Sequence, residues 1–541
     1  MGLGILEDKH LQHVPGTSVF TKDPNAAAEG IYEGVDLDTL KHGKGKHAHI
    51  VLVPQPSDDP NDPYNWPAWK KHATFLVLVY GTTLCGALGP LLSAGQVSLA
   101  AEFGVSLQAI SRALGTALVT TLAISTIFWA ALATKFGKRP VYIAATIFML
   151  VGTIIAGEAK TYGTLLGARI IQGIGQAPLE FLVGSSIADI YHVHQRGPPV
   201  AAWTLSLLAG ISVTPPIAGH VYTVLGWRWC WRIFSITTAV LLIVQLFFLP
   251  ETTYNRSSPV VSGRTSSIEV GEKGDLDHAE HASAASVSPK KTFIQDMKIY
   301  NGTFDKTGPS FGYLLVEPFF LSISPVVLFA IATYGLAITL LVATGAAQIF
   351  VGTYGFDTAG VGNTYCAALL ANFLGAGLVG PLTDFTARKL SSRNKGIFEP
   401  EFRLPMIIFY LVFGGMGLYG FGGVVGHDLG YWGAIVFFGI LNFGITIGCS
   451  CIISYTVDCH KRSSDAALGA VIFGKNALSA IFTSFTNDWL DQGIDKAFYC
   501  MGSLAVGTSL LAIPMWIYGK RSRSWIARTL HVEKEEQTVV A

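Results

Sequence analysis

Three ionisable side chains lie inside long apolar stretches and could do chemistry there. Arg169 and Glu180 belong to one stretch, and Lys475 lies near the middle of another. A charge near the centre of a bilayer costs on the order of 3 kcal/mol, so such residues face the protein interior and find partners. Eleven residues make about three helical turns, so Arg169 and Glu180 share one helix face. This pattern indicates proton transfer or ion pairing inside a membrane bundle.

Each of these residues also has a purely structural interpretation. Arg169 could instead form a fixed ion pair that holds helices together. Glu180 is either the group that gains and loses a proton or a residue at the membrane interface. Lys475 could bind an anionic or carbonyl-bearing substrate, neutralise Glu180 or Asp458, or extend toward the membrane surface. We expect Arg169 and Glu180 to couple protons and Lys475 to lie in a substrate cavity.

Other polar or amphipathic side chains within apolar stretches are candidates for the few hydrogen-bonding groups of such a cavity. For each one alone, hydrogen bonding between helices is the commoner explanation. An aromatic, weakly polar cavity would suit bulky apolar or cationic organic compounds. The candidates are Gln96, Tyr334, Asn372, Asn442 and Tyr455.

The composition indicates what positions these groups. Hydrophobic residues make up 50% of the sequence and charged residues 13%, against about 25% charged residues in soluble proteins. The apolar residues lie in runs of about 20, the length that crosses a bilayer as a helix. A net charge of +1 argues against nucleic-acid binding. Most of the seven cysteines lie in apolar runs without a CxxC pair, so we expect no disulfide framework and no metal site. No Ser-His-Asp constellation or phosphate-binding loop stands out, so we also expect no cofactor and no catalytic residue.

We therefore predict an all-α integral membrane protein with twelve transmembrane helices. Parallel six-helix repeats around a site at mid-membrane are typical of secondary transporters. We expect two pseudo-symmetric six-helix bundles. The predicted spans are 74–96, 110–132, 141–158, 163–186, 201–223, 231–249, 324–347, 361–382, 405–425, 431–455, 466–486 and 497–518.

The polar segments divide the chain into domains. Residues 1–72 read as a disordered cytoplasmic tail without a signal peptide. Residues 73–250 and 323–520 form the two bundles, and 251–322 form a cytoplasmic linker that could end in an interfacial helix. Residues 521–541 form a cytoplasmic tail. Lys and Arg are concentrated in the loops on the side of both termini, which marks that side as cytoplasmic.

A short basic motif occurs twice, 250 residues apart, at the exit of an apolar run. The copies are AALATKFGKRP at 130–140 and GPLTDFTARK at 380–389. The ends of spans four and ten also match, since each places an aspartate before histidine and basic residues. We predict two matched latches between the basic motifs and these aspartates. Their residues are Lys138, Arg139 and Asp189 in the first half, and Asp384, Arg388 and Asp458 in the second.

These motifs resemble the major facilitator superfamily. The first basic motif is similar to its loop signature between helices 2 and 3, with Thr134 in place of the usual aspartate, which predicts a weaker first latch. RIIQGIGQA resembles the span-four signature and implies proton coupling at Arg169. GISVTPPIAG resembles a worn antiporter signature in span five, and we expect a helix bend at Pro215 and Gly219. The segments GWRWCWRI, PET, NW and PEFRLP resemble the fungal twelve-span drug/proton antiporter branch.

The resemblance implies a secondary transporter that works by alternating access and is not an enzyme. We expect a monomer in the plasma membrane that exports a small organic compound against proton entry. Its other partners would be the lipid bilayer and protons, with no nucleic acid. Two alternatives stay open: a proton-coupled importer of a nutrient or organic cation, and a non-transporting membrane sensor.

Overall fold

The computed structural model describes residues 4–11, 14–19, 52, 56–57, 59–192, 195–254, 290–300, 310–343, 346–394, 396–460 and 463–529. Most of the predicted N-terminal tail lies outside these residues. So do most of the predicted linker, the loop cations Lys461 and Arg462, and the chain beyond residue 529.

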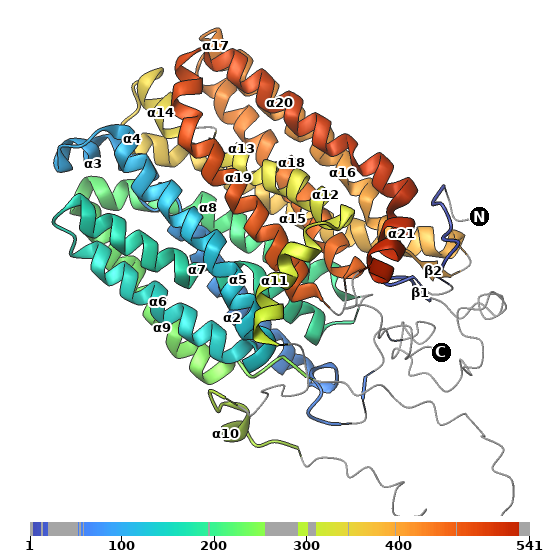
Figure 1. The fold of residues 1–541 in the computed structure, drawn as a ribbon. Coiled ribbons are helices and arrows are strands. Elements are labelled where there is room, and N and C mark those ends of the chain that lie inside the picture. Colours follow the sequence, from blue (N-terminus) through green and yellow to red (C-terminus); the bar gives the residue numbers. More distant parts are fainter. Residues whose placement is uncertain are drawn as a thin grey trace, which may run out of the picture.

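The N-terminal half of the protein is a helical bundle (Figure 1). Its first helix is broken at Gly89 and Pro90, and its second contains the π-helical turn η5 between α4 and α5. The helices are α2 (Ala68–Leu88), α3 (Gln96–Phe103), α4 (Leu107–Ser111), η5 (Arg112–Ala117), α5 (Leu118–Phe136), α6 (Lys138–Gly157), α7 (Tyr162–Ile190), α8 (Gly197–Leu225) and α9 (Trp227–Phe248), with the short 3-10 turns η3 (Pro63–Asn65) and η4 (Ser93–Gly95).

Two short helices connect the halves, and a second bundle follows. The connecting helices are α10 (Phe293–Asp296) and α11 (Phe311–Leu321). The C-terminal half contains α12 (Pro325–Ala330), η7 (Ile331–Gly335), α13 (Leu336–Ala343), α14 (Ala346–Gly352), α15 (Thr358–Arg393), η8 (Pro400–Met406), α16 (Ile407–Phe409), η9 (Tyr410–Gly414), α17 (Gly415–Gly426), α18 (Tyr431–Cys459), α19 (Ser464–Asp491), α20 (Ile494–Leu510) and α21 (Ala512–Thr529).

These helices agree with twelve spans. Among the described residues, ten helices are long and apolar enough to cross a membrane. The bent pair Phe311–Leu321 and Pro325–Thr339, which meet at 66°, adds another. Helix α7 is less apolar because it carries Arg169 and Glu180, but its 29 residues pack along α5 and α6 inside the bundle. The predicted all-α membrane fold is confirmed.

The two basic motifs, although similar in sequence, fold differently. In the first motif Gly137 ends α5 with a φ of 91° and α6 starts at the next residue. This left-handed region is open to glycine and strained for most other residues. In the second motif the aligned residue is Ala387, and α15 runs on without a break to Arg393. The second motif therefore lies inside a 36-residue helix, near its C-terminal end, and the positive-φ turn comes later, at Gly396.

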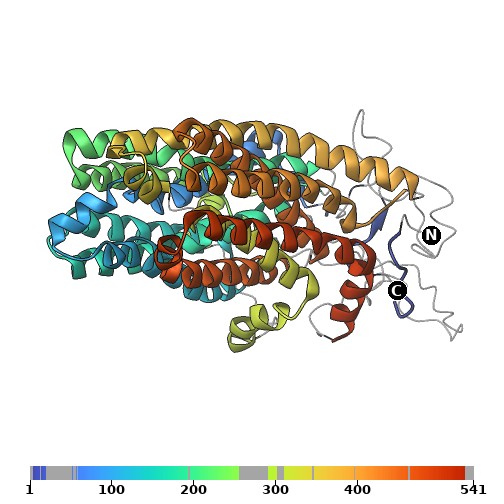
Figure 2. The ribbon, with the colours of Figure 1, turned by 90° about the horizontal axis from the view of Figure 1, so that it is seen from above.

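The halves meet along two pairs of helices. Helix α8 of the N-terminal half packs along α15, and α5 packs along α19. Backbones approach closely where α8 and α15 cross, since a Cβ on Gly362 would lie 2.4 Å from the carbonyl oxygen of Pro215. Small residues allow such approach in membrane bundles. In the view of Figure 2, α8 and α15 lie beside each other along their length.

The start of the chain is packed against one end of the bundle, in contrast to the disordered tail that we expected. Residues Ser18–Val19 form strand β1, which pairs antiparallel with β2 (Ile397–Phe398). Ile5 is buried in a small apolar cluster with Phe398 and Phe402. Helix α21 also continues to Thr529, past the predicted start of the C-terminal tail at residue 521. Strand β1 and the end of α21 thus lie at the same end of the molecule (Figure 1).

We call this end the basic end, and define it by Lys138, Arg196, Arg403 and Arg523. The other end, which carries α3, α4 and α14, is called the opposite end. The cytoplasmic location of the basic end stays a prediction.

Candidate functional site

A cavity of about 260 Å³ lies between the two halves. Both halves contribute to its wall, and the π-helical turn η5 contributes Leu114 and Gly115. π-Helical turns inside α-helices are frequent at functional sites. Its polar and aromatic lining residues are Ser93, Gln96, Ser111, Gln176, Glu180, Ser212, Tyr365, Phe438, Asn442, Lys475, Asn476, Ser479, Thr483 and Thr486.

An ion pair joins the halves inside this cavity. The amine of Lys475 on α19 contacts the carboxylate of Glu180 on α7, and both side chains are buried. Removing one partner of a buried pair leaves an uncompensated charge and costs about 3–5 kcal/mol. Of the sequence alternatives for Lys475, the structure therefore shows the pairing with Glu180.

The ion pair lies near the middle of the bundle. Lys475 follows Ser464, the first residue of α19 at the basic end, by eleven residues, which corresponds to about 16 Å along the helix axis. Thr486 follows Lys475 by another eleven residues and also lines the cavity. Gln96 and Ser111, whose side chains are hydrogen-bonded at 3.0 Å, line it from α3 and α4. The cavity thus extends from the ion pair toward the opposite end.

Two amide groups in the cavity wall have polar atoms without a partner among the described residues. They are Oε1 of Gln176 and Nδ2 of Asn476. Gln176 lies one turn before Glu180, and Asn476 follows Lys475 directly. An unsatisfied buried polar atom is costly, and a ligand can supply the missing hydrogen bond. Sequence reasoning did not select these two residues, although their spacing from Glu180 and Lys475 pointed to them.

Only some of the residues that we predicted to line the cavity do so in the structure. Gln96, Asn442 and Lys475 line it. The other three are packed between helices and are not among the residues that line this cavity, contrary to our expectation. They are Tyr334, Asn372 and Tyr455.

Those three residues have contacts that explain their burial. Asn372 on α15 donates to Ser212 Oγ at 3.0 Å and accepts from Thr446 at 2.8 Å, so it ties three helices together. Tyr455 packs edge to face on Phe329. Tyr334 is buried in η7, beside Gly335, where an added Cβ would lie 3.2 Å from the Cα of Lys475. Asn372 therefore forms hydrogen bonds between helices, which is the common role of polar residues in membrane spans.

Arg169 is not the partner of Glu180. Its guanidinium donates to the carbonyl oxygens of Leu88 at 3.0 Å and Gly89 at 3.2 Å, and to Gln172 Oε1 at 3.1 Å. It also lies over the ring of Trp231 at 5.1 Å. The last carbonyls of a helix lack partners within the helix and attract cations. Arg169 therefore holds the end of α2 at the break that leads into the cavity wall.

In the N-terminal half, the latch is a lysine between two carboxylates. Lys138 Nζ lies 2.7 Å from Asp189 Oδ2 at the end of α7, as the paired motifs predicted. It also lies 3.4 Å from Asp465 Oδ1 on α19, which belongs to the other half. Asp465 was not among the predicted latch residues. Lys138 is buried, whereas the side chains of Asp189 and Asp465 are 24% and 21% exposed, so water reaches both contacts from the carboxylate side.

Arg139 has a different role from the one that we predicted. It donates to the carbonyl oxygens of Leu246, Leu249 and Met297, and so ties α6 to the end of α9 and to the residue after α10. The carboxylate of Glu251 accepts hydrogen bonds from the backbone N–H groups of Lys138 and Arg139 at 3.0 and 3.1 Å. A carboxylate at a helix N-terminus is stabilising.

In the C-terminal half, the latch is a carboxylate between two cations. Asp458 Oδ2 lies 2.6 Å from Arg403 Nε, and Asp458 Oδ1 lies 3.6 Å from Arg196 Nη1 of the other half. Arg196 also donates to the carbonyl oxygens of Ala188 and Tyr191 at the end of α7. From the sequence we placed both Arg196 and Arg403 among the basic residues of loops, and Arg403 also in the PEFRLP motif, so both roles were missed.

The predicted partnership of Asp384 and Arg388 with Asp458 is not what the structure shows. Arg388 is exposed and donates to the backbone carbonyl of Asp384 on its own helix at 3.2 Å. Asp384 lies against Gly197, the first residue of α8, where an added Cβ would be 2.2 Å from its Oδ1. Its carboxylate thus lies at the N-terminus of a helix from the other half.

The two residues predicted to bend α8 lie in the interface between the halves. Pro215 and Gly219 are inside α8, and an added Cβ on Gly219 would lie 2.8 Å from the carbonyl oxygen of Thr358 at the start of α15. A proline within a helix removes one backbone hydrogen bond. Both residues therefore lie at the crossing of α8 and α15.

Sequence comparison relates this chain to a known family of proteins. A sequence profile of the Major Facilitator Superfamily matches residues 74–484. Protein HOL1 of Saccharomyces cerevisiae is 25% identical, over 96% of this chain and 97% of its own length. MFS-type transporter penM of Penicillium rubens is 25% identical, over 91% and 92%. Efflux pump radE of Floropilus chiversii is 25% identical, over 86% and 84%.

Solved structures agree in fold. The proton:xylose symporter XylE has a TM-score of 0.55 at 13% identity and covers 83% of this chain and 96% of its own. The human organic anion transporter MFSD10 has a TM-score of 0.52 at 16% identity, over 83% and 100%. With a match across most of the chain and the two-bundle fold in place, this chain belongs to the Major Facilitator Superfamily of membrane transporters.

Proposed function

We propose that this transporter exports a small organic compound in exchange for protons, by alternating access of the cavity to the two sides of the membrane. It acts as a monomer in the plasma membrane, with both termini in the cytoplasm. The observation that carries the proposal is the buried pair of Glu180 and Lys475 in the cavity, with one residue from each half.

Glu180 and Lys475 can couple proton movement to substrate movement, because the proton and the substrate would bind at the same place. A proton on Glu180 would neutralise its carboxylate and release Lys475, which could then bind an electron-rich group of the substrate. Loss of the substrate would restore the ion pair and favour loss of the proton. The unpartnered amide atoms of Gln176 and Asn476 supply one acceptor and one donor beside the pair. Arg169 would contribute indirectly, by positioning the end of α2.

The cavity favours a small substrate over a bulky one. Its volume of about 260 Å³ lies just below the range for small-molecule sites, about 300–1,000 Å³. Tyr365 and Phe438, whose rings meet edge to face, give it an aromatic wall. We therefore expect a compact compound with an apolar body and a few hydrogen-bonding groups.

Two relatives that are named as efflux pumps, and one motif of this sequence, support export. The relative radE is called an efflux pump, and so is MFS2 of Trichophyton rubrum, which is 24% identical. The sequence GISVTPPIAG in α8 resembles an antiporter signature. A proton-coupled importer is the second candidate, because a cavity extending toward the opposite end could also load substrate from outside.

The direction can be tested in cells that lack the gene. A strain without this protein should accumulate at least one compound of a toxin and metabolite panel, and should be more sensitive to it. Re-expression should reverse both effects. Reduced accumulation in the deletion strain would support import instead, and no pH-dependent flux in vesicles would count against coupled transport.

The coupling role is tested by Glu180→Gln. We expect this variant to lose transport driven by a proton gradient, and to be less stable because Lys475 is left charged and buried. The double variant Glu180→Gln/Lys475→Gln should recover stability without recovering the response to the gradient. Glu158→Gln is the control, because Glu158 is an exposed carboxylate paired with Arg232. Full gradient-driven transport by the stable double variant would refute the coupling role.

A further inference from the structure

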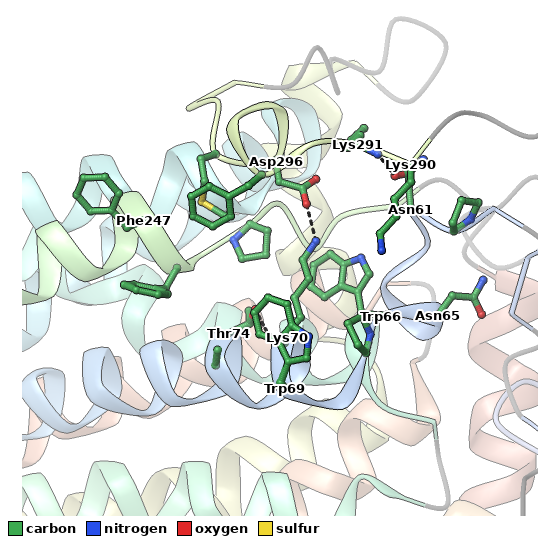
Figure 3. Close-up of a pocket in the computed structure, with 17 residues that line it drawn as sticks. Asn61, Asn65, Trp66, Trp69, Lys70, Thr74, Phe247, Lys290, Lys291 and Asp296 are labelled. Atoms are coloured by element: carbon green, nitrogen blue, oxygen red, sulfur yellow. Dashed lines mark hydrogen bonds and ion pairs between the residues drawn. The ribbon is translucent and has the colours of Figure 1, made fainter.

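A second cavity, of about 450 Å³, lies at the basic end of the N-terminal half. It lies between the start of α2, the end of α9 and the short helix α10, and it shares no lining residue with the central cavity. Neither the latches nor the proposed transport cycle needs it. Figure 3 shows its side chains.

The polar lining of this cavity carries an excess of positive charge. Lys70, Lys290 and Lys291 line it together with one carboxylate, Asp296. Asp296 pairs with Lys70 at 2.5 Å, and the side chains of Lys290 and Lys291 are exposed. The backbone N–H of Lys291 donates to Asn61 Oδ1 at 2.9 Å, which holds the lysine segment at the cavity edge. In Figure 3 these two lysines and Asn61 lie together on one side.

The rest of the wall is apolar and faces outward. Phe247 and Phe248 end the membrane helix α9, and Trp69 is in the first turn of α2. More than half of each of these side chains is exposed. Figure 3 places Phe247 on the side away from Lys290 and Lys291. Exposed phenylalanines at the end of a membrane helix face lipid chains, and tryptophan and lysine are typical of the level of the headgroups.

The start of α2 adds a third feature. Its N-cap residue is Pro67, which provides no side-chain cap for the first N–H groups, and Pro67 lines the cavity. The N-terminus of a helix favours negative charge, phosphate groups in particular. Lys70 also lies over the ring of Trp66, 4.2 Å from its centroid, which fixes its amine at this place.

We propose that this cavity binds an anionic glycerophospholipid from the membrane leaflet at the basic end. The phosphate lies among Lys70, Lys290 and Lys291, and an acyl chain follows Phe247 and Phe248. A soluble phosphate compound would satisfy the cations but not the exposed aromatic wall. A zwitterionic lipid would fit the wall without using the excess positive charge.

The bound lipid would reach the first latch through one residue. Met297 lines the lipid cavity, and its carbonyl oxygen accepts a hydrogen bond from Arg139 at 2.6 Å. Arg139 follows Lys138, the cation of the latch. A lipid that orders α10 therefore stabilises the start of α6. This inference does not depend on the direction of transport or on its coupling to protons.

The experiment uses the full chain in nanodiscs of phosphatidylcholine, with and without phosphatidylserine, and counts retained lipids by native mass spectrometry. We expect the protein to retain phosphatidylserine in preference to phosphatidylcholine. Lys290→Ala/Lys291→Ala should weaken this retention on the order of tenfold, because each cation near the surface contributes to anionic lipid binding. Ala73→Phe, which fills the cavity without changing charge, should weaken it as well.

The control is Lys389→Ala/Arg393→Ala, which removes two exposed cations from the basic end of the other half. It should leave phosphatidylserine retention unchanged. Equal loss in this control would show general attraction to charge and overturn the site. Binding of soluble glycerophosphate as tightly as the diacyl lipid would overturn the lipid assignment, and so would equal retention of phosphatidylcholine. Thermal unfolding of each variant checks that it is folded.

Discussion

In the N-terminal half a cation, Lys138, lies between two carboxylates, whereas in the C-terminal half a carboxylate, Asp458, lies between two cations. Each latch includes one contact within its half and one contact across to the other half. In both crossing contacts the cation belongs to the N-terminal half and the carboxylate to the C-terminal half. The pair within each half thus has the same signs, a cation at the start of the third helix of the half and an aspartate at the end of the fourth. Only the third residue of the latch differs in sign, since it is Arg196 before α8 and Asp465 in the first turn of α19.

The junction between the third and sixth spans does exchange the signs of its charges between the halves. In the N-terminal half, Glu251 after the sixth span binds the N-terminus of the third span at Lys138. In the C-terminal half the carboxylates precede or begin the third span, as Glu399 and Glu401, and the cation is Arg523 in the last helix. Position relative to helix ends, rather than residue type, is what the two halves share.

The halves also differ in what covers them. Arg523 donates to the backbone carbonyl of Pro15, and Lys520 pairs with Glu7 at 2.6 Å, so the first residues of the chain are bound to the C-terminal half. Gly16 is close to Asp458, whose backbone oxygen would lie 2.8 Å from an added Cβ. The second latch is therefore covered by the N-terminal segment.

The largest expected effect is a difference in stability between variants of the two latches. Asp458→Asn should destabilise the protein by about 3–5 kcal/mol, because it removes the carboxylate that contacts buried Arg403 at 2.6 Å. Asp189→Asn should cost about 1 kcal/mol or less, because the Asp189 side chain is 24% exposed and Lys138 keeps Asp465. Thermal unfolding in one detergent measures both. Equal losses of stability in the two variants would show that the two latches contribute equally to stability.

The helix pairs between the halves can be compared by adding one methyl group to each. Gly197→Ala would place a Cβ 2.2 Å from Asp384 Oδ1, and we expect a cost of about 1–3 kcal/mol from overpacking. Gly469→Ala, where α19 faces α5, would place it 3.6 Å from Ala130 Cβ. Because alanine favours helix by about 1 kcal/mol over glycine, that variant should be neutral or more stable. Similar thermal midpoints for the two variants would contradict this difference.

Removal of residues 2–19 should weaken the C-terminal half by on the order of 2 kcal/mol, since hydrogen bonds to charged groups contribute about that much. Thermal unfolding of the truncated and full chains measures the loss. Burial raises the pKa of Glu399, but Arg523 and Lys520 outweigh it and hold the pKa below its usual range.

The lowered pKa of Glu399 gives that prediction a pH dependence. A depressed carboxyl pKa contributes stability at neutral pH that is lost on acidification toward the lowered value. Thr17, in the removed segment, donates to Glu399 Oε2 at 2.8 Å and so favours the charged carboxylate. The advantage of the full chain over the truncated one should therefore shrink as the pH falls below the usual range of a glutamate. A constant difference would separate the segment's contribution from Glu399.

The smallest effect is expected at Thr134, where the superfamily signature has an aspartate. Thr134 is exposed and donates to the carbonyl oxygen of Ala130 at 3.1 Å. Thr134→Asp would place a carboxylate in solvent, so we expect a change in stability within about 0.5 kcal/mol. Transport rate and thermal unfolding both test this. A strongly slowed transporter would show that this position acts on closure of the basic end, as the signature suggested.

The sequence alone determined the class of protein and the place of its charged site. Runs of apolar residues can form only helices in a bilayer, because each backbone group must find a partner within its own segment. The cost of burying charge likewise singled out Glu180 and Lys475 as residues with partners. The resemblance to the superfamily, drawn from short motifs, is confirmed.

Only the tertiary structure decided which charges meet. Helical spacing placed Glu180 on the face of Arg169, but packing paired it with Lys475, 295 residues away. Sequence alignment matched Lys138 with Arg388, but α15 has Ala387 where the first motif has Gly137, so the helix continues and Arg403 takes the latch position. Periodicity is local, whereas pairing across halves depends on where helices end, and one backbone angle can move that point by many residues.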